Sequence, residues 1–378
     1  MGIESIDPVD LTRELVRFDT TTPKDSGLQS FLISKLRPLG FRDFALPFND
    51  VQNFYAQLGQ TGPHFCFAGH TDVVPSGPAD QWTFPPFAAV LDQDCLIGRG
   101  VADMKGAVAA MISAVSSFLA KRPLSRGSIS FLITGDEEGP AVDGTAKVME
   151  WLNRSNEKID YCLVGEPTSV RQIGDTIKFG RRGSINGRIL LYGVQGHTAY
   201  PALARNPLHE ALPFLSELVN IRFDEGNESF EPTHLSLTNM NGGTGTNNVI
   251  PDRLEIRFNI RNGTASSFKS IQDKIEQTIQ QSGIRYSLEM LEAGRAFLTP
   301  KRKLVETLVD SVRECEGITP ELSTSGGTSD ARFIAPAGID VAELGLKNES
   351  IHKINERAPV QDIRKLAKIY ETLLTKLL

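Results

Sequence analysis

A histidine and an aspartate, His70 and Asp72, follow the apolar run Phe65 to Ala68, which has the character of a buried strand. Residues two apart in an extended chain point to the same face, so both side chains project together where the run ends. The carboxyl end of a strand is where open α/β sheets bind ligands. A neutral imidazole is a common zinc ligand, and a nearby carboxylate can fix its tautomer. Taken alone, the pair could equally be the polar end of a strand.

Acidic side chains follow two further apolar runs. Asp136, Glu137 and Glu138 come directly after the run 129–133, and Glu166 follows the run 161–164. Consecutive acids at the end of a buried strand repel one another unless a cation neutralises them, and a metal ion is the simplest such cation. The pattern therefore favours a metal site over a solvated run of charges.

Two more candidates gain meaning only together with the others. Asp103 lies in GRGVADMKG at 98–106. It is either a helix N-cap or a carboxylate that is oriented by an unusual backbone conformation, which the flanking glycines allow. His352 lies in a polar segment before the last helix and could be an ordinary surface residue. All these motifs together supply enough ligands for two ions that share one carboxylate. Oxygen and nitrogen ligands without cysteine suit catalytic zinc, manganese or cobalt.

The elements that must position these residues alternate between strand and helix. Short apolar runs at 65–68, 128–133 and 161–164 predict buried strands, and the alanine-rich segment 106–120 predicts a helix between the first two. The fold class that we expect is therefore α/β, with a mixed, mostly parallel sheet flanked by helices.

The texture of the sequence changes after residue 180. Six patterns follow in the order β-α-β-β-α-β, at 182–194, 206–219, 233–240, 254–260, 265–281 and 286–290. This is the order of ferredoxin-like domains. The sequence therefore predicts a domain of residues 182–295 that is inserted into a metal-binding catalytic domain of residues 1–181 and 296–378.

Composition argues against several function classes. The 378 residues carry a net charge of -6, whereas nucleic-acid-binding proteins are more often basic. We expect no signal peptide, because charged and apolar positions alternate near the N-terminus. We also expect no membrane span, because no run approaches the roughly 18 apolar residues that a span needs. The four scattered cysteines are typical of a reduced, cytoplasmic protein. We expect neither a nucleic acid nor a membrane as a partner.

These motifs identify the sequence as similar to the M20 family of metallopeptidases over essentially the whole chain. The matching segments are GHTDVVP at 69–75, GRGVADMKG at 98–106, DEEG at 136–139, GEP at 165–167, GRRGS at 180–184, GHTAYP at 196–201, NNVIP at 247–251, SGGTSDARF at 325–333 and IHKINE at 351–356. The resemblance implies an enzyme that hydrolyses small N-acyl amino acids with two divalent metal ions per subunit, zinc first, with cobalt or manganese as alternatives. It also implies a homodimer joined through the inserted domain, which would act as a lid.

The resemblance further implies the ligands of each ion. Asp103 would bridge the two ions. His70 and Glu166 would complete the site of one ion, and Glu138 and His352 would complete the site of the other. All five positions are occupied by residues that can coordinate a metal.

Three further side chains would act around the metals. Glu137 would accept a proton from the attacking water and deliver it to the leaving amine. Asp72 would orient His70. His197, contributed by the second subunit, would help to stabilise the tetrahedral oxyanion. Without the resemblance, His197 would be interpreted as a histidine of a Gly-His-Thr turn.

Three of the segments, GRRGS, GHTAYP and SGGTSDARF, point to the branch of the family that acts on N-succinyl-LL-2,6-diaminopimelate. The products would be succinate and LL-2,6-diaminopimelate, in lysine and cell-wall precursor biosynthesis. This substrate carries several carboxylates, and guanidinium groups bind carboxylates bidentately. The positions that the resemblance assigns to substrate are Arg181, Ser184, Asn247, Asn248, Arg261, Gly327, Thr328 and Arg332, with Arg182 as an adjacent candidate.

Two alternatives stay open. Another amide hydrolase of the family, such as an acetylornithine deacetylase, an aminoacylase or an aminopeptidase, would share the metal chemistry and differ in the arginines and the inserted domain. A non-catalytic homologue that binds metal would have no use for a base at Glu137.

Overall fold

Strand β3 (His64–His70) lies inside an eight-stranded sheet, and every one of its residues is buried. It pairs in parallel with β6 (Ser128–Thr134) on one side and with β7 (Tyr161–Val164) on the other. Parallel neighbours run in the same direction, so the three strands end at the same edge of the sheet. That edge carries His70 and the acidic motifs.

The structure, a computed structural model, describes residues 3–378. The strand order of the large sheet is β1-β2-β6-β3-β7-β18-β8-β17. Its other strands are β1 (Arg42–Ala45), β2 (Phe54–Leu58), β18 (Asp340–Glu343), β8 (Thr176–Lys178) and β17 (Glu321–Ser323). Four of the neighbouring pairs are parallel and three are antiparallel. The predicted mixed, mostly parallel sheet is therefore confirmed.

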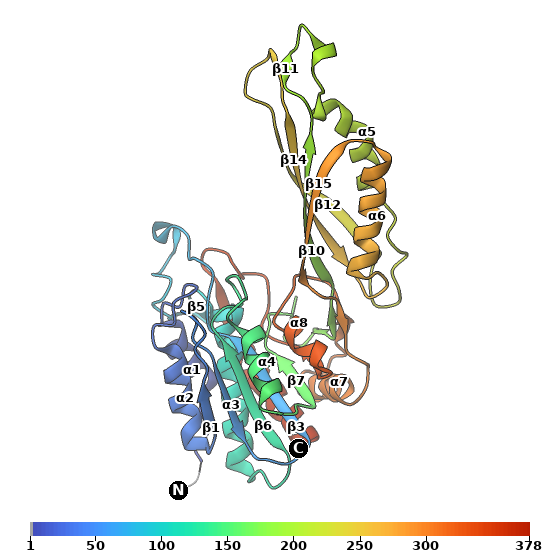
Figure 1. Cartoon of the computed structure of the whole chain (residues 1–378). Helices are drawn as coiled ribbons and strands as arrows, with labels where there is room; N and C mark the ends of the chain where they lie inside the picture. Colours follow the sequence, from blue (N-terminus) through green and yellow to red (C-terminus); the bar gives the residue numbers. More distant parts are fainter. Residues whose placement is uncertain (1–2) are drawn as a thin grey trace. The chain divides into compact units, whose positions relative to one another are not determined.

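Helices flank this sheet (Figure 1). They are α1 (Pro8–Val16), α2 (Leu28–Leu36), α3 (Gly106–Lys121), α4 (Thr145–Arg154), α7 (Lys303–Glu316), α8 (Ala331–Ile334) and α9 (Val360–Leu377). Helix α3 packs against α1 and α9, and α7 packs against α9. The apolar residues of α1, α2, α3, α7 and α9 join those of the sheet in one core.

Helix α3 is more apolar than the sequence analysis allowed. The segment Val101–Lys121 has the length and hydropathy that a membrane-crossing helix needs, although we expected no such run. However, 94% of its apolar window is buried inside the structure. A helix that is apolar all round is expected at the centre of a core, so burial accounts for its composition.

A small three-stranded sheet joins two loops that lie far apart in the sequence. Its order is β19-β5-β4, with β4 (Val90–Asp92), β5 (Cys95–Ile97) and β19 (Arg357–Pro359). Strand β19 pairs antiparallel with β5, so that Arg357 lies opposite Ile97. The pairing brings the segment that follows β5 beside the segment that precedes β19.

The chain divides into two compact units. Unit 1 comprises Met1–Gly180, Thr299–Ser323 and Ser329–Leu378, and unit 2 comprises Arg181–Leu298 and Thr324–Thr328. The boundaries that we predicted were 181/182 and 295/296. The structure also assigns five residues of the later Gly/Ser/Thr loop to unit 2. The two-residue strands β9 (Gly180–Arg181) and β16 (Phe297–Leu298) form a sheet of their own.

Unit 2 contains a four-stranded antiparallel sheet in the order β12-β14-β10-β15. Its elements are β10 (Gly183–Tyr192), α5 (Pro207–Val219), β12 (His234–Gly242), β14 (Arg253–Asn262), α6 (Phe268–Gln281) and β15 (Arg285–Gly294). Alternate residues of β14 are buried and share an apolar core with α5 and α6. A second, two-stranded sheet pairs β11 (Gly196–His197) with β13 (Val249–Ile250).

Candidate metal centre

The carboxyl ends of β3, β6 and β7 each contribute a metal-binding candidate in unit 1. His70 is the last residue of β3 and is 1% exposed. Glu137 and Glu138 follow the end of β6, and Glu166 follows the end of β7. Each side chain is thus fixed by the end of a buried strand.

The ring of His70 is oriented from its Nδ1 side. That nitrogen lies 2.9 Å from the backbone carbonyl of Asp72 and 3.6 Å from its carboxylate. We predicted that the carboxylate of Asp72 would orient the ring, whereas the structure gives the shorter contact to the carbonyl. The Asp72 carboxylate instead accepts hydrogen bonds from the amides of Glu137 (3.2 Å) and Glu138 (3.0 Å). Asp72 therefore joins the histidine to the acidic loop.

Asp103 lies between the two histidines. It is part of a short helical segment, η3 (Val101–Lys105), but its own φ of -124° and ψ of 96° are not helical. Its Oδ1 is 3.3 Å from Nε2 of His70, and its Oδ2 is 3.3 Å from Nε2 of His352. One carboxylate thus faces both imidazoles, as the bridging role that we predicted requires.

Two ligand sets share this aspartate. His70, Asp103 and Glu166 form one set, and Asp103, Glu138 and His352 form the other, with the potential ligand atoms of each set within 4.8 Å of one another. Within the second set, Nε2 of His352 is 2.9 Å from a carboxylate oxygen of Glu138. All five predicted ligands therefore converge.

The first set is suited to a cation because its polar atoms lack partners. Nε2 of His70, Oδ1 of Asp103 and Oε1 of Glu166 are buried, and none of the three has a hydrogen bond among the described residues. An unsatisfied buried polar atom is costly, and three that face one another are explained by a ligand that satisfies them all. A divalent ion with nitrogen and oxygen ligands has that chemistry. The residues therefore fit the metal.

The second histidine is more accessible than the first. The side chain of His352 is 51% exposed, and its backbone φ is 59°, in the left-handed region. The hydrogen bonds to Asp103 and Glu138 raise the pKa of the His352 imidazole to about 10. The negative charge of these carboxylates favours a positive charge at this place, which a protonated His352 ring supplies.

The carboxylates respond to the same crowding. Burial, together with the charges of Asp103 and Glu137, raises the pKa of Glu166 well above its ordinary value. Burial also raises the pKa of Glu137 to about 8, against the lowering effect of His70. Without a cation these two carboxyls therefore tend to keep their protons, whereas a bound cation would favour their ionised forms.

Glu137 lies at this cluster without belonging to either of the two sets that share Asp103. One of its oxygens is within 4.8 Å of potential ligand atoms of His70 and Glu138. Its position beside the ligands leaves it able to exchange a proton with a molecule held there.

The predicted substrate residues of unit 2 fall into two groups, and the predicted catalytic residue His197 lies in the second. The first group lies where β10 begins and β14 ends. Ser184 is directly opposite Arg261 in the sheet, and Nη1 of Arg181 donates to the carbonyl of Gly327 at 3.1 Å. Thr328 follows Gly327 in the same unit. Burial and the nearby charge of Arg182 both lower the pKa of Arg261, so two guanidinium groups gather here.

The second group lies where β10 ends and β14 begins. It consists of His197, Asn247 and Asn248, because β11 pairs with β13 and the Thr198 amide donates to the Asn248 carbonyl at 3.1 Å. All three residues are exposed. Nδ1 of His197 accepts a hydrogen bond from the Ala199 amide at 3.0 Å. At about 3.4 Å per residue, the strand from Ser184 to Tyr192 keeps the two groups roughly 27 Å apart.

Arg332, the last predicted substrate residue, belongs to unit 1. It lies in α8, and its guanidinium carbon is 4.6 Å from the centre of the Phe333 ring. Within unit 1, burial raises the pKa of the neighbouring Asp330 carboxyl to about 6, although the charge of Arg332 acts to lower it.

Sequence reasoning missed two residues that organise the cluster. Glu356 and Arg99 are almost completely buried and form an ion pair of 2.8 Å. Both lie inside motifs that the sequence analysis singled out, IHKINE and GRGVADMKG. The available signal was that each motif contains a charged residue without an assigned role.

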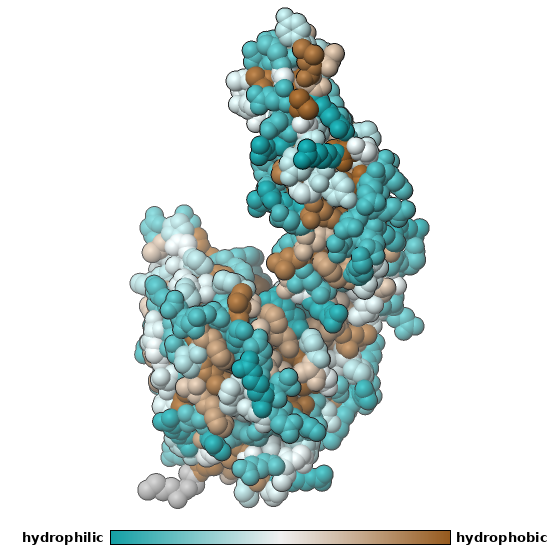
Figure 2. Space-filling model, in the orientation of Figure 1, coloured by the Kyte–Doolittle hydropathy of each residue, from teal (hydrophilic) through white to brown (hydrophobic). Residues whose placement is uncertain are grey.

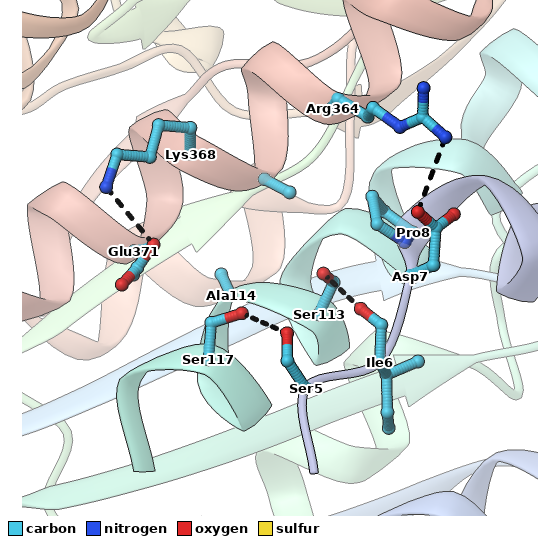
Figure 3. A pocket seen from close by; sticks show the side chains of 11 residues that line it. Ser5, Ile6, Asp7, Pro8, Ser113, Ala114, Ser117, Arg364, Lys368 and Glu371 are labelled. Atoms are coloured by element: carbon cyan, nitrogen blue, oxygen red, sulfur yellow. Dashed lines mark hydrogen bonds and ion pairs between the residues drawn. The ribbon is translucent and has the colours of Figure 1, made fainter. Parts of the chain in front are cut away.

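A separate cavity of 370 Å³ in unit 1 lies among residues of α1, α3 and α9 (Figure 3). The hydroxyls of Ser5 and Ser117 pair at 2.7 Å, and Arg364 pairs with Asp7 at 3.4 Å. Its described side chains include none of the buried polar atoms that lack a partner. The sheet edge is therefore the better candidate for a functional site.

Comparison with known proteins agrees with this geometry. The sequence profile of peptidase family M20/M25/M40 matches residues 66–376. The chain belongs to this family. Members of the family are metal-dependent hydrolases, and the two ligand sets at the sheet edge fit that chemistry.

Relatives within the family extend over the whole chain. The succinyl-diaminopimelate desuccinylase of Alkalilimnicola ehrlichii is 50% identical over 370 residues, which are 98% of this chain and 99% of that protein. Among solved structures, the M20 family metallo-carboxypeptidase Sso-CP2 of Sulfolobus solfataricus has a TM-score of 0.82 at 18% identity and covers 98% of this chain and 99% of that one. A Bacillus subtilis protein described as a dinuclear metal-binding peptidase has a TM-score of 0.71 at 16% identity, with 98% and 97% covered. Both structural likenesses show the fold.

Proposed function

We propose that this chain hydrolyses the succinyl amide of N-succinyl-LL-2,6-diaminopimelate, giving succinate and LL-2,6-diaminopimelate for lysine and cell-wall precursor biosynthesis. The single observation that carries the proposal is the 50% identity to a relative named for this activity, over nearly the full length of both chains. The paired ligand sets of unit 1 supply the metal chemistry that the reaction needs.

The metal centre of the proposal contains two divalent ions, zinc first, with cobalt or manganese as alternatives. His70 and Glu166 would hold one ion, Glu138 and His352 would hold the other, and Asp103 would bind both. When bound, such ions polarise an amide carbonyl and lower the pKa of water towards about 7. The unpartnered buried atoms of His70, Asp103 and Glu166 support this assignment.

Glu137 is the general base of the proposal. Its carboxylate accepts a proton from the water that attacks the amide carbonyl, and then donates that proton to the nitrogen of the leaving amine. Asp72 supports the base because its carboxylate accepts a hydrogen bond from the Glu137 amide. A protein that only binds metal would have no use for a carboxyl held in this place.

The substrate carries a carboxylate on the succinyl group and one at each end of the diaminopimelate. Arg181, Arg261 and Arg332 would bind these groups with guanidinium forks. Further donors would come from Ser184, Asn247, Asn248, Gly327 and Thr328. The cross-strand pairing of Ser184 with Arg261 and the bond from Arg181 to Gly327 support a shared subsite for four of these residues.

His197 would complete the site from the second subunit of a homodimer and stabilise the oxyanion. The separation of His197 from Arg261 along β10 supports this, because one copy of unit 2 cannot bring both groups to the same small molecule. The second group of predicted residues, Asn247 and Asn248, lies beside His197 and would cross the interface with it.

The surface of unit 2 offers an interface of the proposed kind. Leu212 and Val219 lie seven residues apart on one face of α5 and are 64% and 46% exposed. Beside this helix, β12 is an edge strand on which Met240 is 49% exposed. Figure 2 shows further apolar surface at the end of unit 2 that carries β11, where Leu203 is 77% exposed. Apolar patches and open strand edges favour association. Unit 2 would thus serve as both dimerisation domain and lid of a cytoplasmic enzyme.

Substrate comparison tests the proposed function. The purified, zinc-loaded protein should release succinate from N-succinyl-LL-2,6-diaminopimelate with a kcat/KM well above that for N-acetylornithine, another N-acetyl amino acid or a dipeptide. Chelation should abolish this activity, and added zinc should restore it. Faster turnover of an acetylated or peptide substrate would instead assign the chain to another activity of the family. No turnover of any of these amides by metal-loaded protein would support a binding role.

A further inference from the structure

The carboxylate of Glu356 is a buried hub of hydrogen bonds beside the metal cluster. Glu356 is 1% exposed. Oε2 accepts from the Gly100 amide at 2.9 Å and from Nη1 of Arg99 at 2.8 Å. Oε1 accepts from the amides of Ala102 (2.9 Å) and Asp103 (3.0 Å). Both oxygens are therefore fully used within the protein, and Glu356 belongs to none of the potential ligand sets of the described residues.

These bonds hold a backbone segment that is not regular helix. Asp103 departs from helical geometry within η3, so the regular bonding of a helix does not position it. Its amide donates to Glu356 instead. The same carboxylate therefore fixes the backbone from which the proposed bridging side chain projects towards both histidines.

Arg99 extends the hub to two other loops. Its guanidinium donates to the carbonyl of Lys353 at 3.2 Å and to that of Pro75 at 3.3 Å, and its carbon lies 5.4 Å from the centre of the Trp82 ring. Lys353 directly follows His352. Pro75 is the last residue of GHTDVVP at 69–75, the motif that contains His70. Arg99 is 2% exposed, so these bonds form away from competing solvent.

Backbone pairing adds to the same connection. The amide of Gly98 donates to the carbonyl of Glu356 at 2.9 Å, continuing the ladder between β5 and β19. The loop of Asp103 and the loop of His352 are thus joined twice, once through the backbone and once through the Arg99–Glu356 pair. Because the two loops belong to one unit, this connection exists within a single subunit.

We infer that Glu356, with Arg99 as its partner, is a positioning residue for the dinuclear centre. The pair holds the loops of Asp103 and His352 together before any ion binds, with Oδ2 of Asp103 3.3 Å from Nε2 of His352. The inference rests on the proposed metal centre and concerns how tightly that centre binds its metal. His70 and Glu166 are fixed separately by the ends of β3 and β7. Loss of the pair should therefore weaken the ion held by Asp103, Glu138 and His352 more than the other ion.

Cobalt binding to the metal-free protein tests this inference without relying on activity. Co²⁺ is added stepwise to wild-type protein and to Glu356→Gln, and the visible absorbance of the bound ion reports the occupancy of each site. Residues that orient metal ligands typically change metal affinity by about 10- to 100-fold. We expect one of the two cobalt affinities to fall by that factor in Glu356→Gln, with a smaller change in the other. Two unchanged affinities would overturn the inference.

A matched control separates positioning from stability. Glu371→Gln changes another buried carboxylate of unit 1, which pairs with Lys368 and with Lys121, the last residue of α3, whereas Asp103 precedes the first residue of that helix. It should leave both cobalt affinities as they are, even where it lowers the midpoint of thermal unfolding. An equal loss of cobalt affinity in Glu371→Gln would show that any buried carboxylate has this effect, and would sink the specific role of Glu356.

A second variant covers the possibility that an unpaired Arg99 prevents folding. Glu356→Gln/Arg99→Met removes both charges, so that no unpaired buried charge remains to destabilise the fold. Circular dichroism of the metal-free protein should show a folded chain, and the cobalt affinity that falls in Glu356→Gln should still be reduced. Recovery of wild-type affinity in this double variant would contradict positioning by Glu356. Failure of wild-type protein to bind two cobalt ions would contradict the proposed centre itself, so the two failures are distinguishable.

Discussion

The Nδ1 atom of His70 lies 2.9 Å from the backbone carbonyl of Asp72. A carbonyl oxygen can only accept a hydrogen bond, so Nδ1 carries the proton and Nε2 of the neutral ring is left with a lone pair. That Nε2 faces Asp103 and Glu166. The backbone of Asp72 therefore selects the tautomer that can coordinate a cation, and its carboxylate is free to serve the acidic loop.

The carbonyl and the carboxylate of Asp72 have different partners, and this gives a first prediction. Asp72→Asn should keep the orientation of His70, because the carbonyl remains, but weaken the hold on the amides of Glu137 and Glu138. We expect affinity for the ion held by Glu138 to fall by about 10-fold or more, with a smaller change at the other ion. Metal titration of the metal-free protein measures both affinities. Asp175→Asn, which alters a carboxylate bonded to three backbone amides elsewhere in unit 1, should change neither affinity. A larger loss at the ion held by His70 would favour the original prediction that the carboxylate orients the ring.

Glu137→Gln should separate catalysis from metal binding. The substitution removes the proposed base while leaving all five proposed ligands, so the protein should retain two ions per subunit and lose about 100- to 10,000-fold in kcat. Elemental analysis after gel filtration gives the metal content, and succinate release gives the rate. The neighbouring Glu138→Gln is the matched control, and it should lose metal as well as activity. Metal loss in Glu137→Gln would make Glu137 a ligand.

Mixed dimers test the assignment of His197 to the opposite site. His197→Ala and Glu137→Gln should each form inactive dimers with normal metal content. In a randomly reassembled equal mixture, half of the dimers are mixed, and each mixed dimer contains one complete site. A twofold symmetric dimer with shared sites should therefore regain about a quarter of wild-type activity. Activity that stays at the level of the two parents, in dimers shown by native mass spectrometry to be mixed, would place His197 in its own subunit's site or outside catalysis.

Asp224 provides a prediction for the pH dependence of stability in unit 2. Burial would raise the pKa of its carboxyl, but hydrogen bonds from Ser266 and Thr233 outweigh burial and lower the pKa to about 2. A carboxyl with a lower pKa in the folded state stabilises fully above its unfolded pKa, near 4, and loses that contribution as the pH falls towards 2. Asp224→Asn should lower the free energy of unfolding by about 1–2 kcal/mol at pH 7.

Urea unfolding followed by circular dichroism checks this prediction. The difference between wild-type protein and Asp224→Asn should shrink as the pH is lowered from 5 to 2.5. An equally large difference throughout that range would mean that the ionised carboxylate is not the source of the stability. Asp252→Asn changes a half-exposed acid of the same unit whose carboxylate pairs with its neighbour Arg253, and it should have little effect at any pH.

The local structure of both units could be read from the sequence where the patterns are long. The alternating apolar residues of β10 and β14 and the long amphipathic helices of unit 2 gave the β-α-β-β-α-β order that the structure has. Short strands were not predicted. β8 has three residues and β18 has four, which is too few for a period to appear. Helix α4 was also missed, although Val148 and Leu152 are buried four residues apart and could have signalled it.

The chemical types of the candidate metal ligands follow from the sequence alone. Buried apolar runs that end in His70, Glu138 and Glu166 leave charged groups at a sheet edge, and the types of ligand follow from the residues themselves. Strand direction then brings the three ends together, because parallel strands share an edge.

Only the tertiary structure decided how the remaining parts meet. The hydrogen bond from the Asp103 amide to Glu356 joins residues 253 apart in the sequence. The choice of the Asp72 carbonyl over its carboxylate, and the separation of His197 from Arg261 along one strand, likewise depend on packing between distant segments. Local patterns report which residues are buried or turned, because these depend on neighbours in the chain. Which buried donor meets which acceptor depends on the closure of long loops, and no local pattern records that.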